Sequence, residues 1–155
     1  MRFQYNDGGR AAAGFRGDAG DCVTRAIAIA TRQDYLTVYH SLNALAKSER
    51  TGKSKRGVSS ARNGVYRQTI RRYLEGIGWN FTPTMGIGTG CRVHLRDGEL
   101  PMGPLIVTVS KHECAVINGV IHDTSDPSRG GTRCVYGFWS SGPAAALDPQ
   151  AWRSK

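Results

Sequence analysis

The sequence predicts an α+β domain in which N-terminal helices precede a C-terminal antiparallel sheet. As far as Ile77 the apolar residues recur at helical spacing, and from Trp79 onward they alternate as they do in strands. Asn118-Gly119 also stands between two β-type runs, which is a strong signal for a tight hairpin. At 155 residues we expect a single domain over residues 1–139, with a flexible tail over 140–155.

The first predicted helix lies in GDCVTRAIAIAT, residues 20–31, and we expect it to be the central element. Its apolar stripe predicts a largely buried helix and consists of Val23, Ala26, Ile27 and Ala30. We expect Asp21 to cap this helix, which places Cys22 in the first turn, where the helix dipole favours a thiolate. On this segment alone, Cys22 is either a nucleophile or a small buried apolar residue.

Two further helices are predicted before the sheet. Asp34 can cap a helix over 35–46, and the apolar positions from Tyr66 to Ile77 predict another, with Gly78 directly after its end. Residues 47–64 between these helices are polar, basic and interrupted by glycine, which is typical of a mobile loop or lid.

Short strands account for most of the rest of the chain. We expect one at Phe3–Tyr5 and others in the ranges 79–85, 91–95, 105–110, 112–117, 120–125 and 133–139.

The positive charge of the chain is concentrated in one region. The formal net charge is +9, and residues 47–72 contain nine basic residues opposed only by Glu49. Those nine are Lys47, Arg50, Lys53, Lys55, Arg56, Arg62, Arg67, Arg71 and Arg72. Such a cluster favours an acidic partner, either an acidic substrate or a nucleic acid.

Neither a membrane-length apolar run nor the apolar centre of a secretory signal is evident, so we expect a cytoplasmic protein that does not bind membranes. The cysteines, Cys22, Cys91, Cys114 and Cys134, are then expected to be reduced. Cys91, His94, His112 and Cys114 match no common zinc spacing, and we expect no metal and no cofactor.

The Asn118-Gly119 turn fixes which hairpin residues share a face. Counting back from it places His112 and Cys114 on the same face as Asp123, with His112 and Asp123 as diagonal neighbours. If this face packs on the start of the Cys22 helix, a Cys-His-Asp arrangement results. In such a triad the cysteine is the nucleophile, the histidine transfers the proton and the aspartate orients the ring. His122, on the opposite face, is the rival base.

The two segments GDCVTRAIAIAT and KHECAVINGVIHDTSDP together resemble the papain-like cysteine peptidase superfamily. GDCVTRAI is also similar to the nucleophile motif of ovarian-tumour-type deubiquitinases. The resemblance implies a papain-like fold and a thiol hydrolase that cleaves a peptide, isopeptide or related amide bond through Cys22, His112 and Asp123. Papain-like enzymes often carry an oxyanion-hole glutamine six residues before the nucleophile, where this chain has Arg16. The candidate donors here are Gln4, Asn6 and the backbone N–H of Cys22.

Three functions therefore remain open from the sequence. The first is a cysteine peptidase or amidase acting on a protein or peptide substrate. The second is a nucleic-acid-binding protein that uses the basic segment 47–72, and the third is an inactive papain-like fold used only for binding. The residues expected to supply substrate or nucleic-acid electrostatics are Lys53, Lys55, Arg56, Arg62, Arg67 and Arg71.

Overall fold

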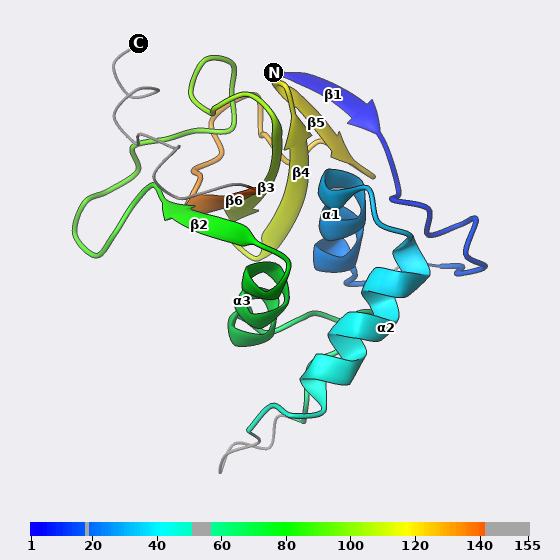
Figure 1. Ribbon diagram of the computed structural model, residues 1–155. Helices are drawn as coiled ribbons and strands as arrows, with labels where there is room; N and C mark the ends of the chain where they lie inside the picture. Colours follow the sequence, from blue (N-terminus) through cyan, green and yellow to red (C-terminus); the bar gives the residue numbers. More distant parts are fainter. Residues whose placement is uncertain (18, 51–56, 142–155) are drawn as a thin grey trace.

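The computed structural model describes residues 1–17, 19–50 and 57–141, and it has the predicted α+β composition (Figure 1). Its described helices are α1 (Cys22–Thr31), α2 (Tyr35–Ala46) and α3 (Arg67–Gly76). Its described strands are β1 (Arg2–Tyr5), β2 (Trp79–Pro83), β3 (Pro104–Val109), β4 (His112–Ile117), β5 (Val120–Asp123) and β6 (Gly137–Ser141). No described helix combines the length and the apolar character that crossing a membrane would require.

The strands form a single mixed sheet with the order β1-β5-β4-β3-β6-β2. The expectation of a purely antiparallel sheet is wrong at one edge, because β1 pairs in parallel with β5. The hairpin register is as predicted, with Val116 opposite Ile121 and Ile117 opposite Val120. Asn118 and Gly119 have φ values of 48° and 77°, and positive φ at both turn positions is what a two-residue type I′ turn requires.

Apolar side chains are buried on both faces of the sheet. On one face, residues of the three helices pack with Ile106, Ala115 and Trp139, and Figure 1 shows α1 lying against β4. On the other face, Cys114, Val116 and Ile121 pack with side chains from the segment around Val93 and Leu95. The condition stated for the triad, that the Cys114 face packs on the Cys22 helix, is therefore not met, because the helices cover the Ala115 face.

The predicted strand at 91–95 is absent from the described residues, where only an isolated bridge joins His94 to Cys134. Nearby, Cys91 and Cys134 form a disulfide, which corrects the expectation that all four cysteines are reduced. The last strand begins at Gly137 and not at Arg133. It ends at Ser141, two residues beyond the predicted domain boundary. Residues 142–155 of the predicted tail lie outside the described residues.

The basic segment between α2 and α3 is described only in part, since residues 51–56 lie outside the described residues. Its second half is attached to the helices. The backbone N–H of Ala61 donates to the Asn43 side chain of α2 at 2.8 Å, and the Ala61 carbonyl accepts from Thr24 of α1 at 2.8 Å. Ser60 and Gly64 pair with each other and close a turn, and the backbone of Asn63 in this turn lies close to Gly20, just before α1. Hydrogen bonds therefore connect this half of the predicted mobile loop to α1 and α2.

Candidate active site

Cys22 is the first residue of α1 and carries a free, partly exposed thiol. Asp21 occupies the cap position but makes no side-chain capping hydrogen bond, so its expected role is wrong. Its buried carboxylate instead bonds the Arg25 guanidinium, accepts from the Tyr35 hydroxyl at 2.6 Å and pairs with Arg10 at 3.1 Å. The backbone N–H groups of the first turn of α1 are therefore left without this cap, beside the thiol.

His112 and Asp123 are joined by a hydrogen bond at the end of the sheet. His112 is the first residue of β4, Asp123 is the last residue of β5, and His112 Nε2 lies 2.6 Å from Asp123 Oδ2. The other oxygen of Asp123 accepts from the Thr124 backbone N–H at 2.7 Å and lies 3.4 Å from Arg25 Nη2 of α1. His112 begins β4 and Asp123 ends β5, so both side chains lie at the same end of the sheet. From there they reach α1, although the face they share packs away from the helices.

The imidazole of His112 also interacts with the thiol. Burial lowers the pKa of His112, but side-chain hydrogen bonds to Asp123 and Cys22 and the charges of both groups outweigh it and raise that pKa to about 9. At neutral pH the ring is therefore cationic when it lies between these two acidic groups. The structure thus brings together all three residues of the predicted triad.

Cys22 and His112 open into a pocket of about 560 Å³, which we call the Cys22 pocket. Its walls come from the start of α1, the segment from Asn63 to Ile70, the β3–β4 hairpin, and Tyr136 just before β6. Asn63 is exposed on this wall, and sequence reasoning missed it. The available signal was Asn63-Gly64, a turn-forming dipeptide inside a segment that the sequence otherwise presents only as basic.

Neither Gln4 nor Asn6, the two side chains expected to donate to an oxyanion, lines the Cys22 pocket. The exposed Gln4 amide bonds the carbonyl of Tyr5, and the Asn6 amide lies 3.3 Å from Nδ1 of His122. Gln4 lies in β1, at the outer edge of the sheet beyond β5, and Asn6 directly follows this strand, which explains why neither side chain lines the Cys22 pocket. His122 is bound to Asn6 and does not line the pocket either, and burial lowers the pKa of its ring.

The remaining thiol and the metal-ligating side chains form no second centre in the described residues. Cys114 is fully enclosed in the core, and burial raises the pKa of its thiol. No group of three or more His, Cys, Asp or Glu side chains within the described ranges is placed to hold a metal ion.

The predicted electrostatic residues divide into three sets. Lys53, Lys55 and Arg56 lie outside the described residues. Arg62 is exposed and does not line the Cys22 pocket. Arg67 lines the Cys22 pocket, and Arg71 lies one helical turn further along α3, with its guanidinium 5.7 Å from the centre of the Trp139 ring.

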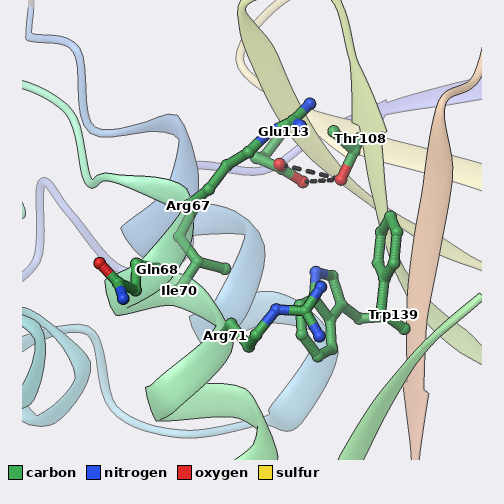
Figure 2. A pocket seen from close by; sticks show the side chains of 8 residues that line it. Arg67, Gln68, Ile70, Arg71, Thr108, Glu113 and Trp139 are labelled. Carbon is green, nitrogen blue, oxygen red and sulfur yellow. Dashed lines mark hydrogen bonds between the residues drawn. The ribbon is translucent and has the colours of Figure 1, made fainter. Parts of the chain in front are cut away.

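A second pocket of about 380 Å³ adjoins the first, and we call it the Trp139 pocket. Both pockets are lined by Arg67, Ile70, Thr108 and Glu113. Figure 2 shows the Glu113 carboxyl group held by the Thr108 hydroxyl, at 2.9 and 3.0 Å to its two oxygens. Burial raises the pKa of Glu113 to about 8, although Thr108, His112 and Arg67 oppose the shift.

Comparisons of this chain with known protein families, with curated proteins and with solved structures found no match.

Proposed function

We propose that the protein is a thiol hydrolase that cleaves an amide or related bond by nucleophilic attack of Cys22. The observation that carries the proposal is the position of His112, whose ring interacts with the Cys22 thiol and also bonds Asp123 at 2.6 Å. A nucleophile, a base and a group that orients the base are the parts that covalent acyl transfer needs.

The reaction begins when His112 holds the proton of Cys22 and the thiolate attacks the carbonyl carbon of the substrate. The backbone N–H of Cys22 and the amide of Asn63, which both border the Cys22 pocket, are the groups we assign to stabilising the oxyanion. His112 then gives its proton to the leaving amine as the carbon–nitrogen bond breaks, which leaves a thioester on Cys22. Water, deprotonated by His112, attacks the thioester and releases the acid and the free thiol.

The papain-like resemblance supports the same proposal. The helix that begins with the nucleophilic cysteine packs on β4, the strand that begins with the histidine, as that family would require. The departure from the family concerns the oxyanion glutamine, whose position holds Arg16 here.

Nucleic-acid binding through residues 47–72 is the second candidate. Its support is the exposed Tyr66, which lies between the exposed Arg62 and Arg72 in the sequence and offers a ring for base stacking. Arg67, however, lines the Cys22 pocket and Arg71 lines the pocket that adjoins it, and these positions favour a role in binding the substrate of the hydrolase.

A test of the proposal uses p-nitrophenyl acetate, a small activated ester. We expect a burst of about one nitrophenolate per protein, together with an acetyl group on Cys22 that intact-mass and peptide mass spectrometry detect. Cys22→Ala should abolish the burst, whereas Cys114→Ala, which removes a thiol enclosed in the core, should retain it. A burst that survives in Cys22→Ala would refute the assignment of the nucleophile.

A further inference from the structure

The Trp139 pocket is placed to receive a substrate side chain that lies close to the scissile bond. It adjoins the Cys22 pocket along a shared wall, to which α3 contributes Arg67 and Ile70 and the sheet contributes Thr108 and Glu113. A substrate whose carbonyl carbon lies at Cys22 can continue into this second pocket without leaving the surface. Its volume, about 380 Å³, lies in the range of pockets that bind small organic groups.

The walls of the pocket combine apolar surface with two cations. Trp139 and Phe81 lie with their ring centres 5.1 Å apart, and Ile70 completes an apolar side that can pack against an aliphatic stem. Figure 2 shows Arg71 beside the Trp139 indole and Arg67 extending from α3 toward Glu113.

The charge of these walls is positive. Arg67 has no carboxylate within ion-pair distance among the described residues, and Arg71 pairs only with Glu75, at 3.0 Å in an exposed position. Glu113 offers little compensation, because burial raises its pKa to about 8 and leaves it largely uncharged at neutral pH. A lysine or arginine side chain of a substrate would therefore meet two like charges, whereas a carboxylate would meet two guanidinium groups that can bind it.

We propose that the Trp139 pocket is a specificity subsite for an acidic side chain of a peptide substrate, with its carboxylate bound by Arg67 and Arg71 and its stem packed on Trp139. This inference rests on the proposed function for the identity of the reacting bond. It assigns to Arg67 and Arg71 one ligand, a glutamate or aspartate residue close to the scissile bond.

The first experiment measures substrate preference in the labelling of Cys22. Two series of peptidyl chloromethyl ketones, acetyl-Xaa-Ala and acetyl-Ala-Xaa, carry Glu, Gln or Lys at the varied position. Each probe forms a carbon–sulfur bond with Cys22 and releases chloride, and intact-mass spectrometry gives the rate. In the series that places its varied residue in the Trp139 pocket, we expect Glu to react at least about tenfold faster than Gln, and Lys to react most slowly.

Matched variants assign this preference to the two arginines. The Arg67→Gln/Arg71→Gln double variant should bring the ratio of Glu to Gln rates close to one. Arg72→Gln, on the same helix but bonded to Ser48 and lining neither pocket, should keep the wild-type ratio. All three arginines are exposed, so the variants should fold. Equal rates for Glu and Gln in both series, or a preference that survives in the double variant, would overturn the inference.

A second experiment reports on the pocket without any reaction. In the Cys22→Ser variant, acetyl-Glu-Ala amide should shift the indole resonances of Trp139 in a nuclear magnetic resonance titration, and acetyl-Gln-Ala amide should shift them far less. Such a shift without alkylation of the wild-type thiol would support the subsite and overturn the proposed hydrolase. Alkylation without any preference for Glu would support the hydrolase and overturn the subsite.

Discussion

Arg25 is the side chain that connects the two buried carboxylates around the candidate triad. It is 9% exposed, it bonds Asp21 within α1, and it lies 3.4 Å from the Asp123 oxygen that does not bond His112. Within the described part of the chain its buried Nε has no hydrogen-bond partner, so the two carboxylates there compensate for the burial of this charge. Arg25 thus holds Asp123 from the side opposite to His112, as a positioning residue.

The replacement Arg25→Met should therefore be costly. It removes the guanidinium group that pairs with the buried carboxylates of Asp21 and Asp123, and we expect the free energy of unfolding to fall by about 3 kcal/mol. Arg72→Met, at an exposed position, should change it by no more than about 0.5 kcal/mol. Urea denaturation of the two variants measures the difference. A loss of less than about 1 kcal/mol in Arg25→Met would contradict the role given to Arg25.

Single residues differ in how far the sequence reveals them. Cys22, His112 and Asp123 could be predicted because each stands at the boundary of an element whose pattern is clear. Arg25 carried a weaker signal, which was a lone cation in a helix predicted to be buried. Asn63 had only its turn-forming dipeptide. That Gln4 and Asn6 lie outside the Cys22 pocket could not be foreseen, because nothing local indicates that β1 pairs at the edge of the sheet.

At the scale of elements, the close approach of two segments shapes the Cys22 pocket. The residue before Asp21 is Gly20, and a Cβ atom added there would lie 2.9 Å from the backbone carbonyl oxygen of Asn63. Only a residue without a side chain allows the Asn63 turn to lie against the start of α1. The pocket wall that carries Asn63 therefore depends on glycine at this position.

Gly20→Ala should push the Asn63 turn away from Cys22 and weaken the stabilisation of the oxyanion. We expect the rate of thioester formation with p-nitrophenyl acetate to fall by roughly tenfold to 100-fold, since an oxyanion donor contributes at least that much. Gly57→Ala, where an added Cβ has no neighbour within 4 Å, is the matched control and should react at the wild-type rate. An unchanged rate in Gly20→Ala would show that the close approach does not matter for the reaction.

Elements were easier to predict than the way they pack. The three helices follow from their apolar spacing, and the hairpin follows from the Asn118-Gly119 turn. The face of the hairpin that the helices cover could not be predicted, because Cys114 and Val116 on one face are as apolar as Ala115 and Ile117 on the other. The Cys91–Cys134 disulfide joins residues 43 positions apart, and no local pattern connects them.

At the scale of the whole molecule, the partly buried His112 and the buried Glu113 make stability depend on pH. The pKa of His112 is raised from 6.5 to about 9, and that of Glu113 is raised from 4.5 to about 8. The folded state therefore binds both protons more tightly than the unfolded state does. The contribution of Glu113 to stability is complete below its unfolded pKa of 4.5 and is lost as the pH rises through about 8. The contribution of His112 is complete below its unfolded pKa of 6.5 and is lost as the pH rises through about 9.

We therefore expect the melting temperature to fall between about pH 7 and about pH 9, by at least about 4 °C. Glu113→Gln stays neutral at every pH, so the fall should be smaller in this variant, chiefly around the pKa of about 8. Glu75→Gln removes an exposed carboxylate and should show the wild-type dependence. Calorimetry of the three proteins across this pH range measures the melting temperature. Identical dependences on pH for wild type and Glu113→Gln would be inconsistent with a neutral buried Glu113.

The central claim, that His112 and not His122 activates Cys22, is tested most directly by the rate of Cys22 alkylation with iodoacetamide as a function of pH. Cys22 is the thiol to follow, because Cys91 and Cys134 are joined in a disulfide and Cys114 is buried. In the wild type and in His122→Ala we expect the same alkylation rate at each pH, because both retain His112 to take up the thiol proton. In His112→Ala we expect much slower alkylation at neutral pH, because the group that takes up the thiol proton is lost. A profile that His122→Ala shifts and His112→Ala leaves unchanged would contradict the account.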